Sequence, residues 1–232
     1  MNTPTKNTIS PIINISELFQ IRDKDEFLII DATNGKDAKI NYEKNHLDKA
    51  LFIDINSQLA EIQSDVSNGG RHPLPSITNF LRTLKSLGIG SNNHLVVYDE
   101  NNGSNAASRL WWMLKAIGHE KVQVLNGGFA IAKRMNYPIN SKKVTIQESL
   151  NEYQLSEWLL PIVTIDQVEQ FSNQPSHLII DVRDENRYLG KVEPIDLIAG
   201  HIPNAINIPF SQNINSDGLF LHKEELKKKY KP

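Results

Sequence analysis

Two short blocks of this sequence each occur twice, and this repeat constrains the fold more than any other feature of the chain. The apolar run at residues 27–32, with Asp31 near its end, returns at residues 177–182 with Asp181, 150 positions later. The block at residues 46–53 returns at 201–208, 155 positions later, so the second copy carries an insertion of five residues (155 minus 150). Because sequence repeats are structural units, we expect two related domains in tandem.

Within each copy, short β-branched runs alternate with segments of helical periodicity. Strands are expected at 94–99 and 122–125, and each repeated block predicts a buried strand followed by a short second strand. Helices are expected at 76–87, with Ser76 as N-cap and Gly88 as terminator, at 106–117 and at 163–171. This alternation predicts an α/β fold in which each domain is a parallel sheet with helices on both faces.

The two copies differ in length. The first domain is expected at residues 1–136, a linker with a docking strand at 137–162, and the second domain at 163–232. The second copy therefore has about 70 residues where the first has about 120. Since a repeat unit needs all of its elements to enclose a core, we expect the second domain to be incomplete.

Composition excludes several classes of function. The 232 residues include 25 basic and 27 acidic side chains, so no basic excess indicates nucleic-acid binding. The chain starts with polar residues and has no apolar run of membrane-spanning length, so a cytoplasmic protein with no membrane partner is expected. It has no cysteine, which excludes disulfides, thiolate metal sites and thiolate catalysis by these residues. We expect neither a cofactor nor a metal.

A set of motifs, in order along the whole chain, resembles the two-domain rhodanese-like sulfurtransferases, which comprise thiosulfate and 3-mercaptopyruvate sulfurtransferases. In the first copy the segments are Gly-Arg-His-Pro-Leu-Pro at 70–75, Val-Tyr-Asp at 97–99 leading into Ser-Arg-Leu-Trp-Trp-Met at 108–113, and Val-Leu-Asn-Gly-Gly at 124–128. In the second copy they are Asp-Val-Arg at 181–183, Arg-Tyr-Leu-Gly at 187–190 and the run at 200–209. The resemblance implies tandem rhodanese-like domains.

The resemblance also implies a chemistry. Such enzymes take sulfane sulfur from a small anionic donor, hold it as a cysteine persulfide, and pass it to a thiophilic acceptor such as cyanide or a thiol. The thiolate lies in a loop between a strand and a helix. In the first copy that loop is 98–104, where Asp99 falls at the cysteine position, so this copy is expected to be catalytically silent. The second copy should supply the cysteine after one more strand, which this sequence lacks. We therefore expect the chain to be truncated and inactive alone.

Three residues are candidates for binding the donor by this resemblance. Arg187 lies in the segment that supplies a guanidinium to the donor, although it could instead be a surface arginine paired with Asp184 or Glu185. Mercaptopyruvate-preferring members bring a second arginine nine residues further on, where this chain has Asp196. This difference favours thiosulfate as the donor.

The other two candidates lie next to each other in the first copy. His72 matches a histidine that acts in a proton relay in some mercaptopyruvate enzymes, although it could be only a loop histidine. Its orienting aspartate falls at Asn56 here. Arg71 could steer anions toward the site. His46 and His201, which the repeat pairs, are expected to bind backbone groups.

The sequence leaves two interpretations of the chain's function open. The first is a sulfurtransferase of the thiosulfate type whose nucleophile is missing from these residues. The alternative is a non-catalytic rhodanese-like module that binds or regulates. An arsenate reductase or phosphatase on a similar sheet would also need a cysteine, so this chain does not favour it.

Overall fold

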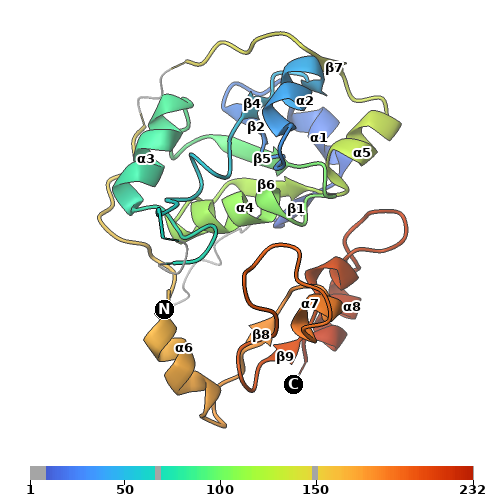
Figure 1. Cartoon of the computed structure of the whole chain (residues 1–232). Helices are drawn as coiled ribbons and strands as arrows, with labels where there is room; N and C mark the ends of the chain where they lie inside the picture. The colour runs from blue at the N-terminus through green and yellow to red at the C-terminus, as the bar shows by residue number, and fades with distance from the viewer. Residues whose placement is uncertain (1–8, 66–68, 148–150, 232) are drawn as a thin grey trace, which may run out of the picture. The chain divides into compact units, whose positions relative to one another are not determined.

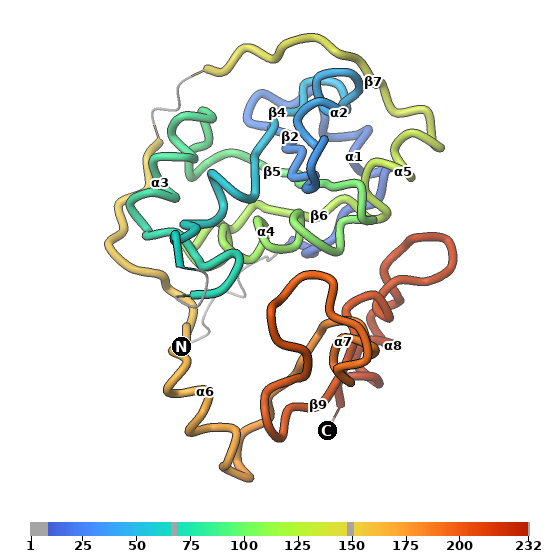
Figure 2. Tube along the Cα trace, in the orientation of Figure 1, coloured from blue at the N-terminus to red at the C-terminus, as the bar shows by residue number. Residues whose placement is uncertain are grey.

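The chain folds as two compact units, which divide after Leu160. The computed structural model describes residues 9–65, 69–147 and 151–231 (Figures 1 and 2). Most of the expected linker lies against the first unit. The Leu159 amide donates to the Ala116 carbonyl at 2.7 Å, and the Trp158 ring stacks on Phe80 and Trp112. The limits of the two domains stay a prediction.

The first unit alternates strands and helices along the chain. Its strands are β1 (Ile12–Ile13), β2 (Phe27–Asp31), β3 (His46–Leu47), β4 (Leu51–Phe52), β5 (His94–Tyr98), β6 (Val122–Leu125) and β7 (Ile139–Asn140). Its helices are α1 (Ile15–Ile21), α2 (Ala38–Lys44), α3 (Ile77–Ser86), α4 (Ala106–Ala116) and α5 (Gly128–Arg134).

The main sheet of this unit has the strand order β1-β6-β5-β2-β4, and every pair in it is parallel. The connections through α1 and α2 run toward β4, whereas those through α3 and α4 run back toward β1. Because crossovers between parallel strands are right-handed, the two pairs of helices cover opposite faces, as Figure 1 shows. This confirms the predicted parallel sheet with helices on both faces. A small antiparallel pair, β3 with β7, lies outside the main sheet.

Local sequence signals explain where the helices begin and end. The Ser76 hydroxyl accepts the Asn79 amide at the start of α3, and Gly88, with φ of +68°, follows its end. Both signals were predicted. The central strands β2 and β5 are fully buried at Ile29, Ile30 and Val96, so this unit has a continuous apolar core.

The second unit contains fewer elements. In the described residues these are the helices α6 (Ile165–Ser172), α7 (Glu185–Tyr188) and α8 (Lys223–Lys229), the 3₁₀ turn η1 (Phe210–Asn213), and the strands β8 (Ile180–Asp181) and β9 (Ile206–Asn207). The two strands pair in parallel.

The two repeated blocks occupy equivalent places in the two units. In the first unit, Ile30 pairs with Leu51 across β2 and β4. In the second, Ile180 pairs with Ile206 across β8 and β9. These positions are displaced by 150 and 155 residues, the same offsets as in the sequence. The repeat is therefore one structural motif formed twice.

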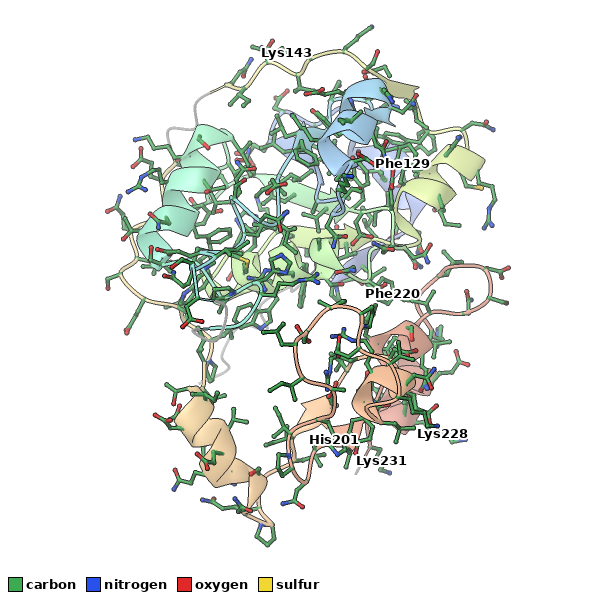
Figure 3. All side chains as sticks on the ribbon, in the orientation of Figure 1. Phe129, Lys143, His201, Phe220, Lys228 and Lys231 are labelled. Carbon is green, nitrogen blue, oxygen red and sulfur yellow. The ribbon has the colours of Figure 1, made fainter. Side chains whose placement is uncertain are left out.

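The burial of the two copies differs sharply. Ile30 in β2 is fully buried, whereas Ile180 in β8 is 39% exposed. Among the described residues of the second unit, only Ala205 and Pro209 are buried. Figure 3 shows side chains filling the space around the first sheet, while Lys228 and Lys231 of the second unit point outward. The second unit, as described, has almost no apolar core of its own.

Candidate functional site

A tyrosine–histidine pair anchors the loop before the second strand of each repeat. The His46 ring stacks on Tyr42 with centroids 4.3 Å apart, and its Nδ1 lies 2.7 Å from the Tyr42 carbonyl oxygen. In the second unit the His201 ring stacks on Tyr188 at 3.8 Å, with Nδ1 again 2.7 Å from the tyrosine carbonyl. Each tyrosine hydroxyl donates to the carbonyl of an alanine, Ala50 or Ala205. Both histidines thus hold backbone groups, as predicted.

Asp99 lies at the end of β5, in the loop where the resemblance places the cysteine of an active copy. Its side chain is fully buried. One oxygen, Oδ1, accepts the amides of Asn101 and Gly103, each at 2.8 Å. The other, Oδ2, accepts those of Asn105 and Ala107 at 3.2 and 3.0 Å. Four backbone N–H groups thus converge on one anionic side chain, and a carboxylate fills the anion-stabilising loop of this copy.

His72 and Arg71 lie in a loop of the first unit. His72 Nε2 is 2.9 Å from Oδ1 of Asn56, so the residue expected at the aspartate position does contact the histidine. Partial burial lowers the pKa of His72, and the charges of Arg71 and Arg109 lower it further, while Asp54 opposes them. Arg71 itself is exposed. The pair is therefore a neutral imidazole beside an exposed cation.

Arg109, on α4, fixes the position of this loop, and the sequence analysis did not select it. Its guanidinium donates to the carbonyl oxygen of Leu59 through both Nε (3.2 Å) and Nη2 (2.7 Å), and through Nη2 to that of His72 at 3.1 Å. Burial lowers the pKa of Arg109. Its place in the motif at 108–113 was the signal available, but its carbonyl partners lie 36 to 50 residues away in sequence.

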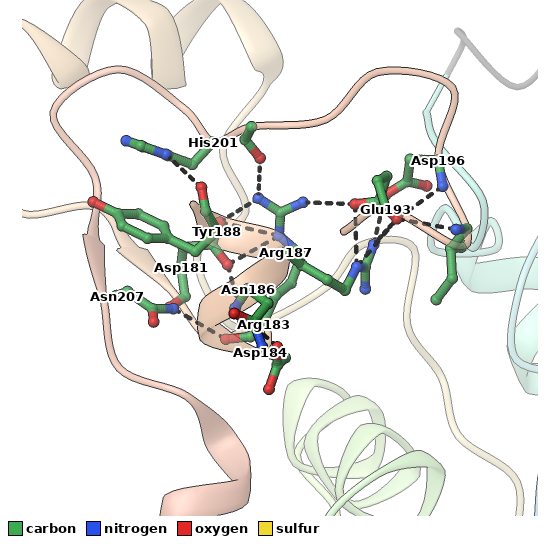
Figure 4. A network of polar contacts seen from close by, with 12 residues as sticks. Asp181, Arg183, Asp184, Asn186, Arg187, Tyr188, Glu193, Asp196, His201 and Asn207 are labelled. Atoms are coloured by element: carbon green, nitrogen blue, oxygen red, sulfur yellow. Dashed lines mark hydrogen bonds and ion pairs between the residues drawn. The ribbon is translucent and has the colours of Figure 1, made fainter. Parts of the chain in front are cut away.

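Arg187, on α7 of the second unit, is bound by two carboxylates (Figure 4). Its Nε lies 3.1 Å from each oxygen of Glu193, and its Nη2 lies 2.9 Å from Glu193 Oε1. The same Nη2 donates to Asp196 Oδ2 at 2.8 Å. The predicted alternative, pairing with Asp184 or Glu185, is wrong. Asp184 instead caps α7 by accepting the Asn186 amide at 2.9 Å.

Glu193 is the centre of this network. Its side chain is 5% exposed, and besides Arg187 it accepts the amides of Ile195 and Asp196, each at 3.0 Å. Arg183 Nη1 lies 3.5 Å from Oε2. The Arg187 hydrogen bonds, followed by the Asp196 amide, lower the pKa of Glu193 to about 2. Glu193 is thus ionised at neutral pH and binds the Nε and Nη2 edge of the Arg187 guanidinium.

Arg183 links this network to the strand β8. It donates through Nε and Nη2 to both oxygens of Asp181, with its shortest contact at 2.6 Å, and through Nη2 to the Gly200 carbonyl at 2.6 Å. The Arg183 hydrogen bonds lower the pKa of Asp181. Two arginines thus face three carboxylates, from Asp181, Glu193 and Asp196, so the cluster carries a net charge of −1 (2 minus 3).

Two kinds of feature are absent from the residues that the structure describes. No helix among them is both long and apolar enough to span a bilayer. No three His, Asp or Glu side chains there gather as metal ligands would.

Comparison with known proteins places the chain in one family. The family described as "Rhodanese-like domain" matches residues 14–131 and 164–232. The 3-mercaptopyruvate sulfurtransferase of Mus musculus is 34% identical over 200 residues, covering 85% of this chain and 65% of that protein. A thiosulfate sulfurtransferase of Cricetulus griseus is 33% identical over 196 residues, covering 83% of this chain and 64% of that protein. The chain thus spans about 65% of the length of these curated relatives.

Solved structures agree with this result. The crystal structure of SseA from Escherichia coli, titled as a 3-mercaptopyruvate sulfotransferase, superposes with a TM-score of 0.79 at 28% identity, covering 95% of this chain and 82% of that chain. The 3-mercaptopyruvate sulfurtransferase from Leishmania major has a TM-score of 0.80 at 24% identity, covering 98% of this chain and 62% of that chain, and supports the fold alone.

The fold and the repeated motif define a protein of two tandem α/β units of one type. The chain belongs to the two-domain rhodanese-like sulfurtransferase family. Its 232 residues contain no cysteine.

Proposed function

We propose that this chain contributes the donor-binding site of a sulfurtransferase of the thiosulfate type. In this proposal the donor anion binds Arg187, and its sulfane sulfur passes to a cysteine outside these 232 residues and then to an acceptor such as cyanide or a thiol. The chain alone is expected to be inactive, because none of its 232 residues is a cysteine, and a carboxylate such as Asp99 cannot carry sulfane sulfur. The cytoplasmic location expected from the sequence stays a prediction.

The observation that carries this proposal is how Arg187 is bonded. Glu193 takes Nε and one hydrogen of Nη2, so the outer edge formed by Nη1 and the second Nη2 hydrogen points away from it. Within the described residues, all hydrogen bonds and ion pairs of the Arg187 side chain are made through Nε and Nη2, and none through Nη1. A guanidinium edge of this kind binds two oxygens of an oxyanion at once, and because Asp196 Oδ2 already accepts from Nη2 at 2.8 Å, a bidentate donor would have to displace Asp196. Asp196 stands where mercaptopyruvate-type members have a second arginine, which supports thiosulfate over a carboxylate donor.

A binding titration tests the donor site. Thiosulfate is added to the 232-residue chain and to Arg187→Gln, and the arginine side-chain N–H signals are followed by NMR. We expect saturable binding that the substitution weakens strongly, with pyruvate, as a carboxylate without a sulfur to transfer, binding more weakly than thiosulfate. Equal thiosulfate binding by both chains would contradict the proposal.

The absence of cysteine also supports a second candidate, a non-catalytic binding or regulatory module. The two differ when a separate peptide that carries an apolar strand, a cysteine-containing loop and a helix is added to the chain. A sulfurtransferase scaffold that pairs with this peptide forms thiocyanate from thiosulfate and cyanide faster than the peptide alone. A non-catalytic module does not increase the rate of thiocyanate formation, even if it binds the peptide.

A further inference from the structure

The first unit contains a cavity that the proposed donor site does not use. Its volume is about 800 Å³, which is in the range of small-molecule sites in proteins. Residues of α2 and β4 form part of its wall, and the segment 141–147 forms another part. This segment follows β7 and carries Lys143, which is labelled in Figure 3. The cavity is therefore formed by the first unit alone.

The segment 141–147 is held close to its two ends. The Lys142 carbonyl oxygen lies 3.1 Å from His46 Nε2. Further along, a side chain on Gly88 would collide with the Gln147 carbonyl, so this backbone packs directly against the turn that ends α3. Residues 143–146 make no backbone hydrogen bond with another described residue. This middle part can therefore adjust to a ligand without breaking backbone hydrogen bonds.

Apolar side chains line the cavity from both parts of its wall. Leu51 and Phe52 come from β4, and Val144 and Ile146 from the segment. Ile146 is 44% exposed, so a ligand in the cavity would cover apolar surface that otherwise faces water. The cavity therefore suits a ligand with an apolar body.

Lys39 adds a positive charge to this apolar wall. Its Nζ lies 4.9 Å from the ring centroids of both Tyr42 and Phe52. The faces of the two rings attract the ammonium without neutralising it. Glu43 Oε1 is 3.8 Å from Nζ, but an ion pair between exposed side chains of this kind is weak. Lys39 is thus a positioned cation that an organic anion can bind.

The other acidic residue at the cavity has its own partners. Asp54 Oδ1 accepts the amides of Asn56 and Ser57, each at 2.8 Å, and the Ser57 hydroxyl at 2.9 Å. Lys143, in contrast, also lines the cavity and forms no ion pair among the described residues. The charges that remain available to a ligand are therefore positive.

From these contacts we propose that the first unit binds an apolar carboxylate, with its charged group at Lys39 and its apolar body between Phe52 and Ile146. This site is independent of the proposed donor site, because thiosulfate has no apolar body that would fill it.

A titration of the full 232-residue chain with naphthoate, an aromatic carboxylate, tests this proposal. Side-chain methyl signals are followed by NMR, and those of Leu51, Val144 and Ile146 are expected to shift together and to saturate. Naphthalenemethanol, which has the same rings without the charge, should bind about 5-fold more weakly, as loss of one ion pair at about 4 Å predicts. Shifts confined to the second unit, or equal affinity for the two compounds, would overturn the proposal.

Substitutions separate the charged and apolar contributions. Lys39→Gln should weaken naphthoate about 5-fold and leave naphthalenemethanol unchanged, whereas Lys39→Arg should bind naphthoate like the unsubstituted chain. Ile146→Ala should weaken both compounds about 3-fold, because it removes part of the apolar wall. A loss of naphthalenemethanol binding in Lys39→Gln equal to that of naphthoate would mean that the lysine acts only on the structure, and would contradict the proposal.

Two matched controls use residues of the same unit that do not line the cavity. Lys133→Gln removes an exposed lysine at the end of α5 and changes the net charge equally. Ile62→Ala truncates an isoleucine that is 46% exposed, close to the value for Ile146. Both controls should bind naphthoate like the unsubstituted chain. Losses equal to those of Lys39→Gln and Ile146→Ala would show that naphthoate does not bind in this cavity.

Discussion

The Nε2 atom of His72 lies 2.9 Å from Oδ1 of Asn56, so the histidine expected in a proton relay is oriented by an amide and not by a carboxylate. An amide oxygen accepts the imidazole N–H but adds no negative charge. The remaining charges close to the ring are those of Arg71, Arg109 and Asp54, and the two arginines favour the neutral form. This copy therefore holds His72 as a hydrogen-bonding group that protonates poorly near neutral pH.

Asn56→Asp is predicted to raise the pKa of His72. The new carboxylate would face Nε2 directly and stabilise the imidazolium. The pKa is read from the ring proton signals in an NMR titration. Gln63→Glu is the control, since it adds the same charge to a neighbouring exposed position without contact to the ring. A His72 pKa that is the same in both variants would show that Asn56 does not orient the ring.

Asp99→Asn is predicted to destabilise the first unit by about 3 kcal/mol. An asparagine oxygen can accept only one pair of the four converging amides, and its NH₂ group would face the other pair, leaving buried donors unpaired. Urea denaturation measures the change in the free energy of unfolding. Asp37→Asn, an exposed N-cap without a side-chain hydrogen bond, is expected to change it by less than about 0.5 kcal/mol. Similar values for the two variants would contradict the four-bond arrangement.

The first unit is predicted to lose stability as the pH falls from about 6.5 to about 4. Burial lowers the pKa of His119 to about 4, and its Nδ1 lies 2.6 Å from the Tyr153 hydroxyl. In the unfolded chain a histidine has a pKa of about 6.5, so across this window the unfolded state takes up the proton first. The stability is therefore complete above pH 6.5 and falls by up to about 3 kcal/mol by pH 4.

His119→Phe should remove most of this pH dependence, measured as the difference in unfolding free energy between pH 7 and pH 4.5. His177→Gln, an exposed histidine of the other unit, should leave it unchanged. If the unfolding free energy of His119→Phe still falls by the same amount between pH 7 and pH 4.5, other groups cause the acid sensitivity.

Hydrogen exchange is predicted to differ between the two copies of the repeat. The β5 amides are fixed between two parallel neighbours in a buried sheet, whereas β9 pairs with β8 in a unit whose described residues bury only Ala205 and Pro209. Amides of β5 should exchange more than about 100-fold more slowly than that of Ile206. Equal protection would show that the second unit is as cooperative as the first.

Much of the fold could be predicted from the sequence because its signals are local. The offsets of 150 and 155 residues between the blocks match the pairing of Ile30 with Leu51 and of Ile180 with Ile206. The N-cap at Ser76 and the terminator at Gly88 depend only on neighbouring residues. The α/β class therefore followed from pattern alone.

The site was less predictable because its contacts cross the chain. The alternative that pairs Arg187 with Asp184 or Glu185 relies on proximity in sequence, but the loop after α7 folds back and places Glu193 and Asp196 on the guanidinium. The periodicity of apolar residues predicts helices and strands, but it does not predict which residues an irregular loop contacts. His119 and Tyr153 meet across 34 residues for the same reason.

Intact-mass spectrometry shows whether these residues, as a sulfurtransferase scaffold without a cysteine, can carry a sulfur atom. The chain is incubated with thiosulfate, freed of excess donor, and weighed before and after the addition of cyanide, while thiocyanate is measured in parallel. We expect no mass increase of one sulfur atom and no thiocyanate above background. A protein-bound sulfur that cyanide removes as thiocyanate would contradict it.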